Sequence, residues 1–219
     1  MGGCMVPTCT RGSNMLTILC EDDDPLLMEK VWSFRHRRFV EQMEWNELRR
    51  RDRRERDQYD RSDIVHAVLV HKQEVIGYSR LLPTTAPHFA RDHSQLASGT
   101  LPSGPDIFEW SRCAIALNAP VINGIAASDL LMTGVLECLV RMGAKAILFL
   151  TYPALVMMMR QRGYPVQVLA DVTLQGHRVE VAYSIIPEDL LSRHYKNYGI
   201  AGTVLCLRAR SRGGLVHSG

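Results

Sequence analysis

The chain has 219 residues, of which 46% are hydrophobic and 22% are charged, and its formal net charge is +3 at pH 7. This length and composition fit one globular domain with a large core, and they exclude a disordered or fibrous protein. No apolar run approaches the ~18 residues that a membrane-spanning helix needs, so we expect no membrane partner.

The first residues, "MGGCMVPTCTRGSN", lack the apolar stretch of a secretory signal. We therefore expect residues 1–14 to form a flexible extension and residues 15–219 to form a single domain. The cysteines form no C-x-x-C pair, and Cys20, Cys113 and Cys138 fall within apolar segments. This pattern predicts reduced, buried thiols in a cytoplasmic protein. No H-x-x-x-H spacing occurs either, so we expect no metal site.

The first quarter of the chain begins with a strand and a helix. Residues 15–20 have the length and apolar character of a strand, and the acidic run after them is typical of a helix N-terminus. Apolar residues at helical spacing then predict a helix over 25–43. Residues 46–63 are almost entirely polar and predict a long loop, a kind of segment that is usually functional when it lies inside a compact domain.

The middle of the chain is rich in strands. Two β-rich runs, 64–71 and 74–82, are separated by Lys72-Gln73 alone and predict a hairpin, although this is not the favoured Asn-Gly turn. A Pro-, Ser- and Thr-rich segment, 83–106, predicts a second long loop. The apolar run 107–116 then predicts a central strand.

The last third alternates helices and strands. Residues 125–143 predict an amphipathic helix, and the continuous apolar run 145–151 predicts a strand covered on both faces. Further elements are expected over 153–162 (helix), 166–170 and 179–185 (strands) and 187–197 (helix). This order predicts an α/β fold, a three-layer α/β/α sandwich with a mixed, mostly antiparallel sheet.

Basic residues gather in two runs, "RHRR" at 35–38 and "RRRDRRER" at 49–56. Such a run is most often a solvated helix end or loop. It could also attract an acidic partner or a phosphate-bearing ligand. We expect no nucleic-acid partner, because no binding motif or interleaved aromatic residue accompanies the runs.

Eight residues in a fixed order point to a particular family. They are Arg35, Phe39 and Trp45 in R-x₃-F-x₅-W, Asp57 and Asp60 in "DQYD", Arg80 in "GYSRLLPTT", and Glu109 and Arg112 in "EWSR". Together they resemble the signature of the acyl-homoserine lactone synthases, the bacterial autoinducer synthases. The resemblance runs from about Met15 to the chain end and is strongest over 31–115.

The resemblance implies the acyl-CoA N-acyltransferase fold and a two-step reaction. The amine of S-adenosylmethionine, a substrate rather than a cofactor, attacks an acyl thioester; its carboxylate then closes a lactone and releases methylthioadenosine. Ordinary N-acyltransferases carry a Gly-rich pyrophosphate turn, which residues 118–129 lack. The twelve-position spacing of Trp45 and Asp57 favours acyl-CoA over acyl carrier protein as donor, and a short, branched or aryl product.

The resemblance also implies roles for the residues around the first helix and loop. Asp57 and Asp60 would hold the cationic substrate, and Arg35 would clamp its carboxylate. Phe39 and Trp45 would wall the S-adenosylmethionine site. Each has an ordinary alternative, since aromatic residues dominate cores and aspartates in a loop are usually solvated.

Arg80, Glu109 and Arg112 are expected to form an ion-pair cluster that anchors the N-terminal lobe to the sheet. Arg80 could instead protect an edge strand. The expected base is a bound water that relays the proton through Glu109 or a backbone carbonyl, and the expected catalytic residues are Glu109, Arg35 and Asp57. Glu109 and Arg112 lie three positions apart in one strand, so a shared cluster requires a bulge, most simply near Trp110-Ser111.

The acyl pocket is expected between the strand 145–151 and the helix that follows. Its candidate residues are Met132, Met142, Phe149, Tyr152, Leu155 and Met158. Ordinary core is the alternative for most of them, because methionine fills irregular gaps generally. Resemblance to family members that make 3-oxo products implies a threonine where Phe149 stands, so this ring favours an acyl group without an oxo substituent.

Two other functions remain open at this level. One is a generic N-acyltransferase that acts on another amine, and the other is a regulator that binds S-adenosylmethionine or a thioester without turnover. Release of methylthioadenosine distinguishes the lactone synthase from both, because only lactone closure produces it.

Overall fold

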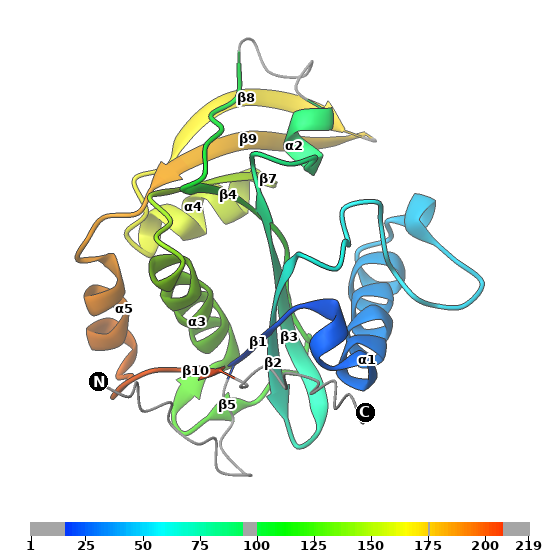
Figure 1. The fold of residues 1–219 in the computed structure, drawn as a ribbon, viewed down its shortest axis with the longest axis horizontal. Helices are drawn as coiled ribbons and strands as arrows, with labels where there is room; N and C mark the ends of the chain where they lie inside the picture. Colours follow the sequence, from blue (N-terminus) through cyan, green and yellow to red (C-terminus); the bar gives the residue numbers. More distant parts are fainter. Residues whose placement is uncertain (1–15, 94–99, 175, 208–219) are drawn as a thin grey trace, which may run out of the picture.

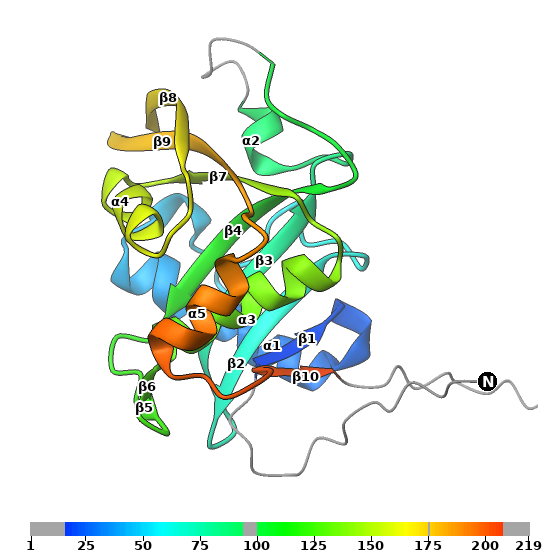
Figure 2. The same cartoon turned by 90° about the vertical axis from the view of Figure 1, so that its left-hand side faces the viewer.

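A computed structural model describes residues 16–93, 100–174 and 176–207, so the expected N-terminal extension lies outside the described residues. One eight-stranded sheet has the order β10-β1-β2-β3-β4-β7-β9-β8. Helix α1 covers one face, and α3 and α5 cover the other (Figures 1 and 2). The predicted α/β class and the mixed, mostly antiparallel sheet are confirmed.

The strands of the sheet are β1 (Leu16–Leu19), β2 (Val65–His71), β3 (Glu74–Pro83), β4 (Ile107–Ile115), β7 (Ala146–Thr151), β8 (Gln167–Leu174), β9 (His177–Ile185) and β10 (Leu205–Leu207). A separate hairpin pairs β5 (Val121–Ile122) with β6 (Ile125–Ala126). The α-helices are α1 (Pro25–Arg35), α2 (Phe89–Asp92), α3 (Ala127–Arg141), α4 (Pro153–Gln161) and α5 (Leu190–Tyr198). No helix among these is long and apolar enough to cross a membrane within the described part of the chain.

The predicted helix over 25–43 consists of two segments. Helix α1 begins at Asp24, whose carboxylate accepts the Leu27 amide at 3.0 Å, with Pro25 at the first helical position. The chain then continues as a π-helical segment, His36–Gln42. Such wide turns are frequent at functional sites.

The predicted hairpin of β2 and β3 is confirmed despite its turn residues. Lys72 and Gln73 have φ angles of 47° and 68°, as a two-residue type I′ turn requires. The loop over 83–106 contains α2, and the loop after β4 contains β5 and β6. The sequence did not predict α2, β5 or β6, because a four-residue helix and two-residue strands carry almost no periodicity.

The two central parallel strands separate halfway along their length. Strands β4 and β7 pair from Ile107 to Glu109, opposite Ala146 to Leu148, and then diverge. Beyond this point β4 remains paired with β3 but faces a gap on the β7 side, and this gap creates the site described below.

Strand β4 also contains the expected bulge, although at a different position. Tyr78 of β3 pairs with Ala114, but Arg80 pairs with Ser111, so one residue of β3 faces both Arg112 and Cys113. Arg112 has a φ of 53°, a left-handed conformation that turns its side chain away from regular alternation. Trp110 and Ser111 pair regularly, so the bulge begins after them.

Candidate active site

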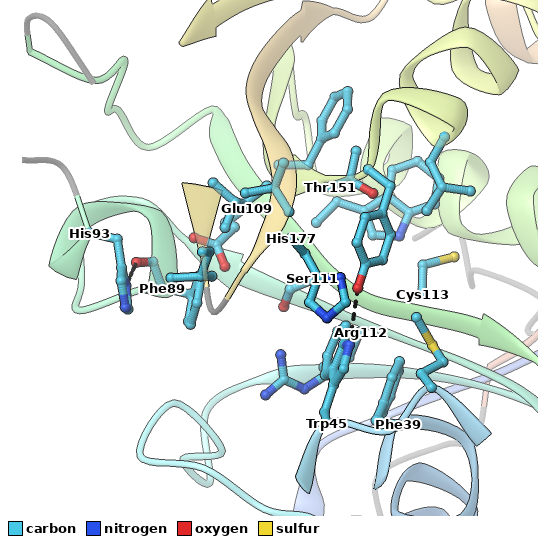
Figure 3. A pocket seen from close by; sticks show the side chains of 18 of the residues that line it. Phe39, Trp45, Phe89, His93, Glu109, Ser111, Arg112, Cys113, Thr151 and His177 are labelled. Carbon is cyan, nitrogen blue, oxygen red and sulfur yellow. Dashed lines mark hydrogen bonds between the residues drawn. The ribbon is translucent and has the colours of Figure 1, made fainter. Parts of the chain in front are cut away.

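A cavity of about 260 Å³ opens where β4 and β7 diverge (Figure 3). Its walls come from segments far apart in the sequence: Phe39 and Trp45 follow α1, Glu109 and Arg112 belong to β4, and Phe149 to β7. The lining is mostly apolar with a few polar groups, which is typical of a small-molecule site.

Five of the six expected acyl-pocket residues lie in the wall of this cavity. They are Met132, Phe149, Tyr152, Leu155 and Met158. Met142 is not among them: it caps the C-terminus of α3 and packs against the core. It lies ten helical residues from Met132, a rise of roughly 15 Å. The structure therefore does not place Met142 in the wall of this cavity.

Phe39 and Trp45 form an aromatic wall at one side of the cavity. Their rings are stacked with centroids 5.1 Å apart, and the Arg112 guanidinium lies 5.6 and 5.5 Å from them. The indole Nε1 of Trp45 donates a 3.1 Å hydrogen bond to the Tyr152 hydroxyl. Trp45 therefore links the loop after α1 to the strand end of β7 (Figure 3).

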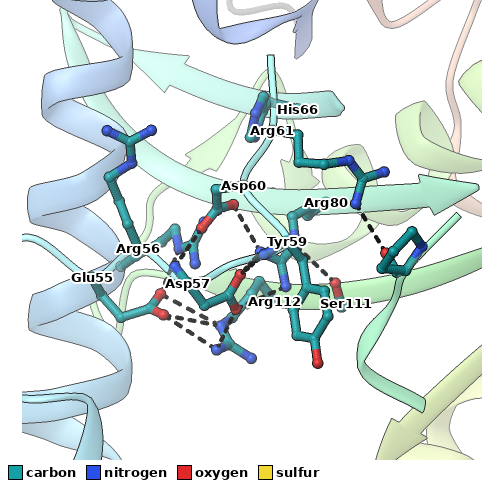
Figure 4. A network of polar contacts seen from close by, with 12 residues as sticks. Glu55, Arg56, Asp57, Tyr59, Asp60, Arg61, His66, Arg80, Ser111 and Arg112 are labelled. Carbon is teal, nitrogen blue, oxygen red and sulfur yellow. Dashed lines mark hydrogen bonds and ion pairs between the residues drawn. The ribbon is translucent and has the colours of Figure 1, made fainter. Parts of the chain in front are cut away.

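A network of three arginines and three carboxylates lies next to this wall (Figure 4). Its ion pairs are Arg35–Glu55, Arg35–Asp60, Arg80–Asp57, Arg80–Asp60, Arg112–Glu55 and Arg112–Asp57. Four of the six side chains are fully buried, and Asp57 and Arg112 are 9% and 10% exposed. The formal charges balance, which makes their burial tolerable.

The network changes the interpretation of the expected substrate contacts. Arg35 is fully buried and binds Glu55 through Nε and Asp60 through Nη1, the latter at 2.7 Å, whereas its Nη2 has no hydrogen-bond partner among the described residues. Asp57 and Asp60 bind Arg80, both at 2.7 Å. None of Arg35, Asp57 and Asp60 lines the cavity, so this geometry does not support direct contact with a substrate. They belong to the framework that holds the aromatic wall.

Glu55 is a central member of this network that sequence reasoning missed. Burial raises the pKa of Glu55, but the positive charges of Arg35 and Arg112 outweigh it and lower the pKa to about 2. For Asp60, Arg35 and Arg80 likewise outweigh burial and hold the pKa well below its usual range. The available signal was weak, because Glu55 is one of two acids within "RRRDRRER", where a solvated loop was the simplest interpretation.

Most of that basic run is indeed exposed. Arg49, Arg50 and Arg51 face solvent, and Arg53 and Arg54 pair with the surface acids Glu41 and Glu29. Arg80, in contrast, lies buried in β3, which has a neighbour strand on each side. The alternative of an edge-strand role for Arg80 is therefore excluded.

Glu109 is buried but lies outside the network that was expected to contain it. Its Oε2 is 2.7 Å from His88 Nδ1 and 2.7 Å from the amide nitrogen of Ala90, and it lines the cavity. The expected ion-pair cluster of Arg80, Glu109 and Arg112 was thus wrong for Glu109, because the segment before α2 supplies its partners. His88 was missed, since an isolated histidine after a proline carries no sequence signal.

The cysteines differ in exposure, and only one of the two described below lines the cavity. Cys138 is a buried thiol as expected, whereas Cys113 is exposed, lines the cavity and lies 3.9 Å from the Met132 sulfur. Across residues 16–93, 100–174 and 176–207, no group of three histidine, cysteine or acidic side chains is arranged to hold a metal ion.

A mixed sheet whose central parallel strands diverge over a ligand-sized cavity defines the N-acyltransferase class of fold. The solved structure of a putative N-acetyltransferase from Lactobacillus plantarum shares this fold, with a TM-score of 0.54, 16% identity, and coverage of 80% of this chain and 100% of that one. The model of the autoinducer synthase family matches residues 21–193, so the chain belongs to this family.

Individual relatives agree with the family. The acyl-homoserine-lactone synthase of Ralstonia nicotianae is 33% identical over 156 residues, which is 68% of this chain and 76% of the relative. The isovaleryl-homoserine lactone synthase of Bradyrhizobium diazoefficiens is 40% identical over 89 residues, 39% of this chain and 40% of the relative's length. The structure of BjaI, a CoA-dependent acyl-homoserine lactone synthase, with SAM and isopentyl-CoA has a TM-score of 0.82 and 25% identity, covering 89% of this chain and 93% of that one. The protein is an acyltransferase of the acyl-homoserine-lactone synthase type.

Proposed function

We propose that this enzyme joins S-adenosylmethionine to the CoA thioester of a short, branched acyl group and releases an N-acyl-L-homoserine lactone. The observation that carries the proposal is a single cavity that contains both expected sets of residues. The aromatic wall of Phe39 and Trp45 lies on one side, and the apolar pocket around Phe149 and Met158 lies on the other. Two substrates that must react with each other need such a shared space.

The aromatic wall fits the S-adenosylmethionine half of the reaction. The stacked rings of Phe39 and Trp45 offer faces that attract a sulfonium cation or stack with an adenine. Arg112 lines the same space with a guanidinium that is 10% exposed, and it is better placed than Arg35 to contact the substrate carboxylate. We assign Arg35, Asp57 and Asp60 to positioning of this wall through the buried network.

The divergence of β4 and β7 fits the thioester half. Beyond Glu109 and Leu148 the two strands no longer bond to each other, so backbone groups along the gap are free to bind a pantetheine arm or the thioester oxygen. Met132, Phe149 and Met158 then surround the acyl chain. The cavity of about 260 Å³ and the bulky Phe149 ring favour a short acyl group, in keeping with a relative named for an isovaleryl product.

The reaction then follows in two balanced steps. The substrate ammonium loses a proton to Glu109, directly or through one water, and the amine nitrogen bonds to the thioester carbon as the CoA thiol leaves. The substrate carboxylate next displaces the thioether at the carbon bonded to the sulfonium, which closes the lactone and releases methylthioadenosine. S-adenosylmethionine is consumed as a substrate, and we propose that no cofactor takes part. Both substrates are intracellular metabolites, so we place the enzyme in the cytoplasm.

The proposal is tested with purified full-length protein, S-adenosylmethionine and a panel of acyl-CoA and acyl carrier protein thioesters. Mass spectrometry would detect the acyl-homoserine lactone and methylthioadenosine in equal amounts, with the highest kcat/KM for a branched five-carbon acyl-CoA. An acylated amine without methylthioadenosine would instead identify a generic N-acyltransferase. Binding of S-adenosylmethionine without any product would identify a regulator.

A variant tests the proton step separately. We expect Glu109→Gln to reduce kcat by a factor of roughly 10² or more, since general bases contribute about 10²–10⁴. Full retention of amide-forming activity in this variant would leave Glu109 with a structural role only.

A further inference from the structure

Glu109 lies at the point where the two central strands separate. It pairs with Leu82 of β3 and Leu148 of β7, the last pair of the parallel ladder. Both neighbours at this register are leucines, so the adjacent strands offer its carboxylate no charged partner there. The side chain is 2% exposed and still lines the cavity. A carboxylate in such a place needs strong hydrogen-bond donors to remain ionised.

The segment before α2 supplies two such donors to one oxygen. Oε2 of Glu109 is 2.7 Å from the Ala90 amide and 2.7 Å from His88 Nδ1. The other oxygen, Oε1, forms no hydrogen bond within the described residues, so it remains available to the cavity. Hydrogen bonds therefore fix Oε2 of the carboxylate, whereas Oε1 can contact a molecule in the cavity.

His88 is itself held firmly. It is 2% exposed, and Arg61 donates a 2.9 Å hydrogen bond to the carbonyl of the preceding residue, Pro87. On its other side, Phe89 stacks on His93 and meets the Tyr59 ring edge to face. The imidazole thus has little freedom to turn away from Glu109.

We propose that His88 is a positioning residue for the reaction, whose Nδ1–H donates to Oε2 of Glu109 and so aims its Oε1 at the substrate ammonium. The inference rests on the proposed function. The N–H bond of the ammonium breaks, an O–H bond forms at Oε1, and the electron pair stays on nitrogen for attack on the thioester. His88 keeps its own Nδ1 proton throughout.

Two arrangements of the contact are conceivable: either His88 carries the proton on Nδ1, or Glu109 carries it. The tautomer of His88 distinguishes them. An ionised carboxylate only accepts, so a proton on Nδ1 must be donated to it. The Arg91 amide also points to Nδ1 at 3.4 Å, and a protonated Nδ1 cannot accept it. The much shorter contact to Glu109 decides in favour of the Nδ1–H form. In the opposite case Glu109 carries the proton and cannot act as a base.

The first test measures this tautomer without any substrate. In full-length protein labelled with ¹⁵N-histidine, two-bond ¹⁵N–¹H correlations distinguish Nδ1–H from Nε2–H, and the His88→Asn variant assigns the signal. We expect the Nδ1–H form at neutral pH. An Nε2–H tautomer with unprotonated Nδ1 would overturn the proposal, whatever product the enzyme makes.

The second test compares two amide variants. In His88→Asn the amide nitrogen takes the position of Nδ1, whereas in His88→Gln it takes the position of Nε2. We expect His88→Asn to keep kcat within about threefold and His88→Gln to lose roughly tenfold or more, with the KM of both substrates unchanged. Equal kcat values in the two variants would overturn the positioning role.

A matched control separates positioning from folding. His194 on α5 is also a buried histidine, it contacts Thr133 and the Arg162 carbonyl, and it does not line the cavity. We expect His194→Gln to lower the Tm as His88→Gln does but to leave kcat intact. A comparable loss of kcat in both would show that the effect of His88→Gln is only structural. If the wild-type enzyme makes no lactone, the proposed function fails while the tautomer measurement still stands.

Discussion

Phe149 lies in the wall of the cavity, at the place proposed for the acyl chain. Its ring is 5% exposed and forms part of the cavity wall, on the side of β7 that faces the core around α3. The adjacent Leu148 is fully buried among residues of the opposite face. Two consecutive residues of one strand therefore have different surroundings, because alternate side chains point to opposite faces.

We expect Phe149→Ala to enlarge the pocket and shift the preference toward longer acyl chains. The ratio of kcat/KM for an eight-carbon to a five-carbon acyl-CoA should rise by roughly tenfold or more, because even one further methylene held in a pocket is worth ~1–3 kcal/mol. Leu148→Ala is the control, expected to lower the Tm without changing this ratio. An unchanged ratio in Phe149→Ala would show that another residue limits chain length.

Glu55 is the residue on which two ion pairs depend. Replacing it by glutamine leaves Arg35 and Arg112 buried without a full countercharge. We expect Glu55→Gln to lower the free energy of unfolding by about 3–5 kcal/mol, measured by urea denaturation. The exposed Glu74→Gln should change it by less than ~0.5 kcal/mol. Equal, small effects of both would mean that the network adds nothing to stability.

At the scale of elements, the hairpin of β2 and β3 is held by its strands rather than by its turn. Lys72 and Gln73 adopt left-handed φ angles that cost these residue types free energy. The chain uses the favoured sequence elsewhere, since Asn123 and Gly124 form the turn between β5 and β6 with φ angles of 51° and 81°. Strand pairing therefore overrides turn chemistry in the larger hairpin.

The combined change Lys72→Asn and Gln73→Gly should stabilise the protein by about 1 kcal/mol, because it supplies the residues that a type I′ turn prefers. The hydrogen bond from Lys30 to the carbonyl of residue 73 is a backbone contact and would remain. The Tm should rise while kcat stays the same. A lower Tm would show that the Lys72 or Gln73 side chain contributes a stabilising interaction of its own.

At the scale of the whole molecule, the buried network joins α1 and the loop after it to strands β3 and β4 of the sheet. Arg35 belongs to α1, Glu55, Asp57 and Asp60 to the loop, and Arg80 and Arg112 to β3 and β4. The long polar loop is thereby fixed along a face of the sheet (Figure 4). Protonation of its carboxylates should therefore weaken the whole fold, not a local part.

The pH dependence of stability follows from the lowered pKa of Glu55 and Asp60. A carboxyl whose folded pKa lies below its unfolded pKa stabilises the fold above the unfolded value and loses this contribution as the pH falls. For Glu55 the shift from 4.5 to about 2 corresponds to on the order of 3 kcal/mol. We expect stability to fall steeply between about pH 5 and pH 2, measured by urea titration. Glu55→Gln should flatten this dependence, and an unchanged slope would contradict it.

The order of the main helices and strands, the sheet class, the family and five of the six candidate residues that line the cavity could be predicted from the sequence. These follow from periodic apolar patterns and from residue types in a fixed order, which act locally or in register. A bulge in β4 was predicted and is present, but the prediction assumed that Glu109 and Arg112 share one cluster, which they do not, and its position differs.

Which charged groups form ion pairs could be seen only in the tertiary structure. Arg35, Asp57 and Asp60 looked like substrate ligands, but the folded loop pairs them with one another through Glu55, Arg80 and Arg112. Glu109 pairs with His88 and not with the arginines, because the segment before α2 covers β4 at that point. Such pairings join residues 20 or more positions apart. They depend on how loops cross the sheet, and no local pattern records that path.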